Sequence, residues 1–293
     1  MISFIISIAV LILGYFTYGK FVEKIFGVDK DRPTPAIRLQ DDVDFMPLPA
    51  WRIFLIQFLN IAGLGPIFGA IAGAMFGPAA FLWIVLGSIF AGAVHDYLSG
   101  MLSVRHDGLS ISEVVGIYLG PKMKHFMRYF TIILLIFVGT VFLMGPAKII
   151  DGMTGNMWNL WVWVGIILVY YILSTLLPID KMISKLYPVF GIAMLLMAVG
   201  LLLALLFGDY HIPEIVPANL RNMTTSPSDT PLFPILFVTI ACGAISGFHA
   251  TQSPLMARCM KNETLGRKIF YGTMITEGIV ALIWAAAAMT FFG

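Results

Sequence analysis

The fold is decided by the stretch FLNIAGLGPIFGAIAGA, residues 58–74. This run is apolar throughout, yet Gly63, Gly65 and Pro66 fall together near its middle. Glycine weakens a helix, and proline removes a backbone donor and disfavours helical geometry at the residue before it. We therefore expect either a broken helix or, alternatively, a stripe of small residues that lets two helices pack closely.

A second stretch has the same character, VTIACGAISGFHATQSP at residues 238–254. It combines Gly243 and Gly247 with a polar run that includes Ser246 and His249. Backbone that is freed from a helix at membrane depth is tolerated only where it faces protein or a water-filled cavity. Two such stretches in one chain therefore favour two broken helices that line a cavity.

The composition places both stretches in a membrane protein. Of 293 residues, 59% are hydrophobic and 12% charged, and the mean hydropathy is +0.91. Soluble domains carry roughly a quarter charged residues and about half apolar. These values exclude an ordinary soluble enzyme, a nucleic-acid binder and a disordered chain. Two cysteines without metal-ligand spacing give no disulfide framework, so we expect no metal and no cofactor.

Eight apolar runs are long enough to cross the ~30 Å of hydrocarbon in a bilayer. They are residues 2–19, 53–75, 79–103, 129–149, 158–177, 188–207, 232–250 and 271–292. The runs are continuously apolar rather than alternating, which indicates helices rather than barrel strands. The predicted fold class is all-α: a polytopic integral membrane bundle of about eight transmembrane helices.

The positive charges orient this bundle. Sixteen of the 18 Lys and Arg residues lie in four connections, 20–52, 104–128, 178–187 and 251–270, and the opposite side holds Lys148 and Arg221. Because cytoplasmic connections are enriched in Lys and Arg, we expect an N-terminus outside and these four connections inside.

The two broken stretches then run in opposite directions and lie five spans apart. This arrangement is typical of secondary transporters that are built from inverted repeats. We interpret the chain as a single membrane domain, 1–293. In it, 1–50 form a lead helix and cytoplasmic loop, 51–207 a first five-helix repeat, and 231–293 the start of a second, incomplete repeat.

Four ionisable groups fall inside the predicted spans, Asp96, His95, His249 and Glu277, and such groups are functional candidates. At 1.5 Å per residue all four lie within roughly 10 Å of the cytoplasmic edge. Asp96 and Glu277 are candidate proton-accepting carboxylates, or helix-end groups that reach water. His249 is a candidate for substrate or proton binding, or a buried histidine satisfied by carbonyls. For His95 a structural role is favoured.

Several stretches together resemble one known family. They are DDVDFMP at 41–47, IAGLGPIFG at 61–69, AGAVHDYLSGMLSVRHDGLSISEVVG at 91–116 and TIACGAISGFHATQSPLMARC at 239–259. The sequence is similar to the carbon starvation protein A family of bacterial membrane transporters. The resemblance implies uptake of peptides or pyruvate across the cytoplasmic membrane of nutrient-limited bacteria, coupled to a proton or sodium ion. It also implies a relation to the amino acid–polyamine–organocation transporters.

The sequence departs from that family in two ways. Family members are usually much longer, so we expect either a shortened chain or one part of a split gene. His95 also stands where a glutamine is expected, so a shared role for that side chain is in doubt.

A transport mechanism follows from the broken helices, because interrupted helices present backbone N–H groups to anions and carbonyls to cations. We expect N–H groups around 63–65 to hold a substrate carboxylate and carbonyls around 243–247 to hold an amino terminus or coupling ion. The expected substrate-binding residues are Gly63, Gly65, Pro66, Gly243, Ser246, Gly247 and His249.

Proton-coupled uptake of peptides is the function that we favour. A sodium- or proton-coupled carrier of pyruvate or other small organic acids is the alternative, and a membrane nutrient sensor that binds without transport is a third interpretation. An integral-membrane enzyme would need a nucleophile–base pair or a metal cluster, and a channel would need a selectivity filter; neither pattern is visible in the sequence.

Overall fold

The computed structural model describes residues 1–63, 65–155, 157–176, 180–220, 222–224 and 226–292. Every regular element in this described part is a helix, so the predicted all-α fold is confirmed. The chain divides into two compact units, one formed by Met1–Ile111 with Tyr187–Gly293 and the other by Ser112–Leu186. The predicted site residues all belong to the first unit.

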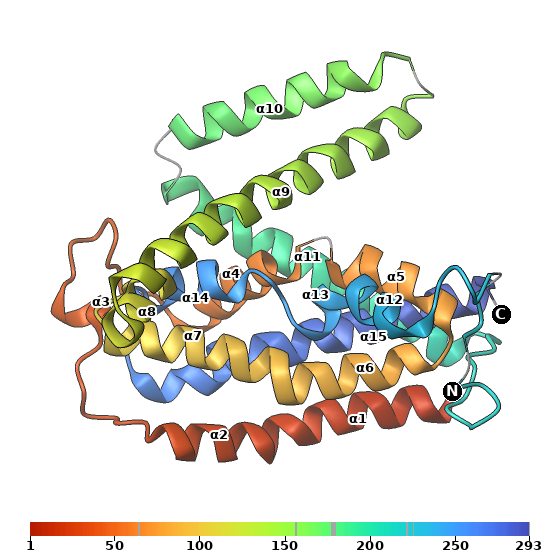
Figure 1. Ribbon diagram of the computed structural model, residues 1–293, viewed down its shortest axis with the longest axis horizontal. Coiled ribbons are helices and arrows are strands. Elements are labelled where there is room, and N and C mark those ends of the chain that lie inside the picture. The colour runs from red at the N-terminus through yellow and green to blue at the C-terminus, as the bar shows by residue number, and fades with distance from the viewer. Residues whose placement is uncertain (64, 156, 177–179, 221, 225, 293) are drawn as a thin grey trace. The chain divides into compact units, whose positions relative to one another are not determined.

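The first unit is built from α-helices (Figure 1), several of which are extended by short π-helical or 3-10 segments that are written η. Its elements are α1 Ile2–Phe16, α2 Tyr18–Phe26, α3 Pro35–Arg38, α4 Ala50–Ala62, η1 Gly65–Gly69, α5 Ala70–Gly73, η2 Ala74–Phe76, α6 Ala79–Gly87, η3 Ser88–Gly92, α7 Ala93–Arg105, the end of α11 Asp180–Phe207, α12 Leu232–Thr239, α13 Ala241–Ala244, α14 His249–Ala257, η4 Glu263–Leu265, η5 Arg267–Tyr271 and α15 Gly272–Phe292.

The second unit holds α8 Ile111–Leu119, α9 Pro121–Met153, α10 Leu160–Leu176 and the start of α11. α9 and α10 pack against each other, and the hydroxyl of Tyr171 donates to the carbonyl of Phe142 at 3.0 Å. Of the most apolar window of α9, 6% is buried inside the chain. A helix this apolar and this uncovered is one that meets lipid or another protein surface.

Five described helices are long and apolar enough to cross a membrane. They are Ile2–Phe26, Ala79–Arg105, Pro121–Met153, Val189–Phe207 and Glu263–Phe291. A sixth is obtained when Ala50–Ala62 and Gly65–Phe76, which are bent by 52°, are taken as one broken span.

The predicted count of eight is therefore not confirmed. The span predicted at 158–177 corresponds to the shorter apolar helix Leu160–Leu173, and the span predicted at 232–250 is divided among α12, α13 and the start of α14. Arg221 and part of the connection predicted at 178–187 lie outside the described residues.

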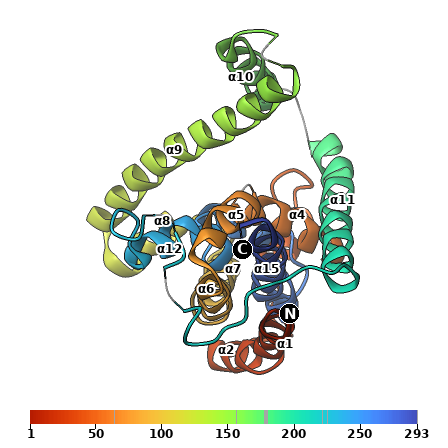
Figure 2. The same ribbon diagram turned by 90° about the vertical axis from the view of Figure 1, so that its right-hand side faces the viewer.

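α15 is the central helix of the first unit. It contacts α1, α4, α5, α6 and α7, and Figure 2 shows these helices around it. Of its apolar window, 72% is buried, because alanines at 285–288 let neighbouring helices approach closely. Thr273 and Glu277 on this helix are therefore held inside the unit rather than at its surface.

Candidate functional site: two broken helices and a buried carboxyl cluster

The first predicted break lies directly after α4. Gly63 follows the helix with φ 47° and ψ −138°, a conformation that residues with a Cβ rarely adopt. The π-helix η1 begins at Gly65, includes the buried Pro66 and packs against α13. A Cβ atom on Gly65 would lie 1.9 Å from the Cβ of Cys242. The two broken stretches therefore touch at a point where only glycine fits.

The second break lies between α13 and α14, where Ile245 is extended with φ −147° and ψ 98°. The hydroxyl of Ser246 donates to the carbonyl of Ile61 at 2.9 Å. That carbonyl is in the last turn of α4, where carbonyls have no N–H donor within the helix. Ser246 of the second break therefore supplies the donor that the end of α4 lacks. The two broken stretches are thus joined by a hydrogen bond as well as by packing.

The glycines of the second break differ in their surroundings. A Cβ on Gly243 would lie 2.8 Å from the Cβ of Ala281, and the Gly243 carbonyl accepts from Ser88 at 3.2 Å. At Gly247, by contrast, no described atom lies within 4 Å of where a Cβ would be. Close packing therefore explains Gly243, but it does not explain Gly247.

Asp96 is fully buried on α7 and receives side-chain donors from three other helices. The amide nitrogen of Gln57 on α4 donates to Oδ1 at 2.8 Å, and the hydroxyl of Ser253 on α14 donates to the same oxygen. The hydroxyl of Thr273 on α15 lies 3.2 Å from Oδ2, and its one proton is shared with the nearer carbonyls of Ile269 and Phe270 at 2.7 and 2.8 Å. No ion pair among the described residues joins Asp96 to Lys or Arg, so neutral groups hold this carboxyl.

A pair of histidines adjoins this cluster. Nδ1 of His95 lies 3.0 Å from Nδ1 of His249, so one ring donates and the other accepts. Nε2 of His249 lies 3.9 Å from Oδ2 of Asp96, which is beyond hydrogen-bond distance, and it has no hydrogen-bond partner in the described part of the chain. The two imidazoles and the carboxyl thus form a row that joins α7 to α14.

Glu277 on α15 is also fully buried, and neither carboxylate oxygen has a hydrogen-bond partner among the described residues. Residues four apart share a face of a helix, so Glu277 lies on the same face as Thr273 and Ala281. Thr273 reaches Asp96, and Ala281 adjoins Gly243. Glu277 therefore lies between the Asp96 cluster and the contact of the two broken stretches.

The ionisable residues that were predicted from depth alone are thus brought near one another. Asp96, His95 and His249 form a contiguous row, and Glu277 lies within electrostatic range of Asp96. Among the described residues, no three His, Cys, Asp or Glu side chains are placed to hold one metal ion.

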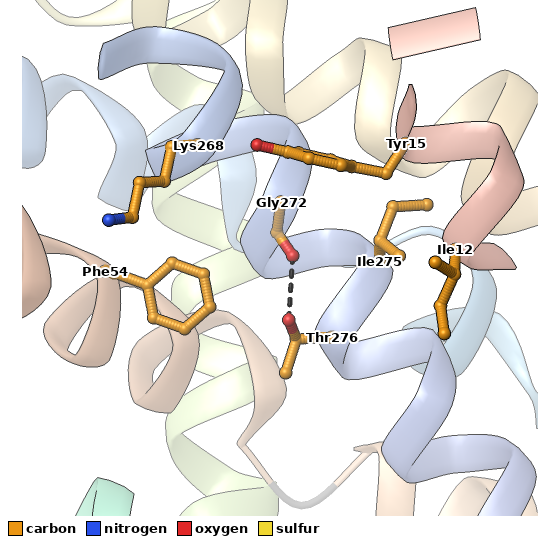
Figure 3. A pocket seen from close by; sticks show the side chains of 7 residues that line it. All are labelled: Ile12, Tyr15, Phe54, Lys268, Gly272, Ile275 and Thr276. Atoms are coloured by element: carbon orange, nitrogen blue, oxygen red, sulfur yellow. Dashed lines mark hydrogen bonds between the residues drawn. The ribbon is translucent and has the colours of Figure 1, made fainter. Parts of the chain in front are cut away.

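A cavity on the other side of α15 is separate from this site. Its volume is about 220 Å³, and it is lined by Ile12, Tyr15, Phe54, Lys268, Gly272, Ile275 and Thr276 (Figure 3). The Thr276 hydroxyl donates to the carbonyl of Gly272 at 2.9 Å. Thr276 neighbours Glu277 in sequence but points to a different face, which makes it a useful control position.

Ion pairs fix the end of the unit that the topology prediction assigns to the cytoplasm. The buried carboxylate of Glu263 accepts from Arg105 Nη2 at 3.1 Å and from the backbone N–H of Asp29 at 2.9 Å. In the loop at 41–47, the backbone N–H groups of Phe45 and Val43 donate to Asp41 and lower the pKa of that carboxyl below its ordinary value. These contacts hold the loops that flank α7 and α14.

The comparison with known families covers nearly the whole chain. The model of the family described as "Carbon starvation protein CstA" matches residues 1–169 and 152–292. The chain belongs to the CstA family. No solved structure matches it.

Relatives of this CstA-family chain differ in length and in name. An uncharacterized membrane protein of Haemophilus influenzae is 43% identical, over all of this chain and 91% of that protein. The peptide transporter CstA of Bacillus subtilis is 28% identical over 97% of this chain and 57% of its own length. The pyruvate/proton symporter BtsT of Escherichia coli is 28% identical over 96% and 48%. This chain therefore spans about half the length of the named transporters.

Sequence reasoning missed part of the cluster in this CstA-family member. Gln57 is the single amide in the apolar run IFLIQFL at 53–59, and a polar group inside a membrane span was a signal that could have drawn attention to it. Ser253 was noted as one of the polar residues of 238–254, but its contact with Asp96 spans a separation of 157 residues. Thr273, at the edge of a predicted span, gave no such signal.

Proposed function

We propose that this chain belongs to a secondary active transporter that takes up short peptides together with protons across the bacterial cytoplasmic membrane, in response to carbon starvation. The observation that carries the proposal is the Asp96 cluster, a buried carboxyl held by neutral donors from three helices. It adjoins two broken helices that contact each other. Such helices form the substrate sites of many secondary transporters.

A proton suits this cluster better than a sodium ion. The Gln57 amide and the Ser253 hydroxyl already donate to Oδ1 of Asp96, and a metal cation would have to displace both. Oε1 of Gln57 has no hydrogen-bond partner among the described residues. When Asp96 is protonated, the amide can turn and accept from the new hydroxyl, so the cluster accommodates both protonation states.

The broken stretches supply the proposed substrate site. The N–H of Gly63 already donates to the carbonyl of Leu59 at 3.3 Å. The N–H of Gly65, at the start of η1, therefore receives a substrate carboxylate, because N–H groups at a helix start carry partial positive charge. On the opposite stretch, the Gly243 carbonyl already accepts from Ser88, which leaves its second lone pair for a ligand. Ser246 links the two stretches and positions them rather than binding substrate through its hydroxyl proton.

The repeat interpretation and the orientation form part of the proposal. Residues 51–207 are a first five-helix repeat and 231–293 begin an inverted second one, with the N-terminus outside. The contact between the two breaks supports this, since inverted repeats place their broken helices together at the repeat interface.

A pyruvate–proton symporter is the second candidate. The relative named as a pyruvate/proton symporter is as similar to this chain, at 28% identity, as the Bacillus subtilis peptide transporter. Pyruvate and a peptide both carry a carboxylate, so the N–H of Gly65 suits either substrate.

Transport by the purified full chain in proteoliposomes tests both candidates. We expect labelled alanyl-alanine to exchange with unlabelled dipeptide inside, and an inward proton gradient to drive its accumulation. Asp96→Asn should abolish the gradient-driven accumulation and retain exchange, because the amide keeps the volume but cannot carry the proton. Thr276→Val, on a different face of α15, should behave as the parent.

Three results would contradict parts of this proposal. Accumulation that is unchanged in Asp96→Asn would remove the proton role of the cluster. Exchange of pyruvate without exchange of dipeptide would replace the first substrate by the second. Exchange of neither solute would favour a sensor.

A further inference from the structure

The Glu277 carboxyl has no role in the proton binding proposed for Asp96. Burying it without hydrogen-bond partners nevertheless destabilises the fold. Asp96 receives donors from Gln57 and Ser253 and lies near the shared hydroxyl of Thr273, whereas both oxygens of Glu277 lack a partner among the described residues. The side chain is 0% exposed, so water does not replace those donors. A buried polar group without partners destabilises a fold, and such exceptions call for a specific explanation.

The position of Glu277 supplies an explanation. On α15 it lies one turn from Thr273, which reaches Asp96, and one turn from Ala281, which adjoins Gly243 of the broken stretch. The carboxyl is therefore directed toward the region in which the two broken stretches meet. This region also has backbone that is not committed to a regular helix, at Gly63 and at 245–248.

The chemistry of the missing partner is narrowly defined. An ionised carboxylate accepts hydrogen bonds and cannot donate, and when it is buried without neutral donors a donor that also carries positive charge stabilises it most. No described Lys or Arg forms an ion pair with Glu277, and His249 is instead directed to His95 and Asp96. The described part of the chain therefore pairs no cation with Glu277, and a ligand ammonium group would supply both the charge and the donors.

We infer that Glu277 is the subsite that binds the ammonium group of the substrate, such as the amino terminus of a short peptide. The inference rests on the proposed transport function, since a solute must reach the contact of the broken helices. Because Glu277 is fully buried, its access requires a helix to move, as alternating access provides. Pyruvate has no ammonium group, so this subsite selects peptides over pyruvate.

Binding of a matched ligand pair to the full chain tests the inference. The probes are alanyl-alanine and N-acetyl-alanyl-alanine, which differ in the ammonium group and keep the same carboxylate. We expect the parent protein to bind alanyl-alanine at least about tenfold more tightly, the scale expected for a charged hydrogen bond. Glu277→Gln should remove that preference and leave the affinity for the acetylated peptide unchanged.

Two further variants distinguish ammonium binding by Glu277 from a merely structural role. Thr276→Val has a comparable volume change on another face of α15 and should keep the full preference. Glu277→Asp keeps the charge on a shorter side chain and should retain part of the preference, which a merely structural role would not produce. If Glu277→Gln does not fold, the preference for alanyl-alanine is compared between the parent and Glu277→Asp, and a reduced preference in Glu277→Asp still supports the ammonium subsite.

The outcomes separate this inference from the function on which it rests. Equal binding of both peptides by the parent, or a preference that survives in Glu277→Gln, would overturn the ammonium subsite while leaving peptide transport intact. Binding of pyruvate by the parent, with binding of neither peptide, would overturn the peptide function and this subsite together.

Discussion

The contact between Gly65 and Cys242 gives the sharpest test of how the broken helices are held. A Cβ on Gly65 would lie 1.9 Å from Cβ and 2.6 Å from Sγ of Cys242. Real Cβ atoms essentially never come closer than 3.0 Å, so alanine at this position must push the two stretches apart by more than 1 Å. A change of rotamer gives no relief, because the Cβ of Cys242 is fixed to its backbone.

The energetic cost follows from this geometry. Overpacking a close contact typically costs about 1–3 kcal/mol, and a clash with an atom fixed to the backbone belongs at the upper end. We therefore expect Gly65→Ala to destabilise the protein by about 3 kcal/mol, seen as a lower thermal midpoint in detergent. Uptake in proteoliposomes should fall with it, because the separation moves both broken stretches.

A compensating change isolates the cause. Cys242→Gly removes both clashing atoms, and the nearest remaining atom of residue 242 is then its Cα, at 3.4 Å. The double variant Gly65→Ala with Cys242→Gly should therefore recover most of the stability that Gly65→Ala loses. Gly247→Ala is the matched control, since no described atom lies within 4 Å of its Cβ position. We expect that control to change stability by less than about 0.5 kcal/mol.

Three results would refute the steric argument. They are a Gly65→Ala variant as stable as the parent, a double variant no better than Gly65→Ala, and a Gly247→Ala variant as damaged as Gly65→Ala.

Three further predictions follow from other contacts. Gln57→Leu removes a donor from Asp96 and should shift the pH at which proton-driven uptake is half-maximal; an unchanged pH profile would separate Gln57 from the proton site. Glu263→Gln leaves a partly buried arginine of α7 without its charge partner and should cost about 2 kcal/mol of stability, measured by thermal unfolding; no loss would show that the pair is not stabilising. Because its pKa is lowered on folding, Asp41 stabilises its loop above its ordinary pKa and loses this effect as the pH falls through the lower folded value. The protection factors of the amides at 43–45, which correct hydrogen exchange for its intrinsic pH dependence, should fall there, and protection factors that do not vary with pH would contradict the prediction.

The sequence predicts the broken stretches well because their cause is local. Gly63 and Pro66 act through backbone conformation within a few residues, and the break after α4 occurs where they stand. The second break is shorter than the polar pattern of 238–254 indicates, because it covers 245–248 and Pro254 lies inside α14. Composition marks a region that differs from an ordinary helix, whereas the bond from Ser246 to Ile61 joins residues 185 apart, which composition does not reveal.

The carboxyl cluster is harder to predict because its cause is not local. Asp96 could be singled out as an ionisable group in a span, but its donors come from positions up to 177 residues away. Their convergence depends on which faces of α4, α14 and α15 pack against α7. Helical periodicity alone does not determine that packing in a chain whose helices are apolar on all sides.

α14 connects the two halves of the proposed mechanism. It begins at His249, directly after the second break, and carries Ser253, which donates to Asp96. A substrate that changes the geometry of the break at 245–248 must therefore move a donor of the proton site. Protonation of Asp96 must likewise change the hydrogen bond that Ser253 of α14 donates to it. Coupling between two sites is reciprocal, so each ligand should strengthen the binding of the other by the same factor. In this arrangement one short helix accounts for the coupling of proton and substrate.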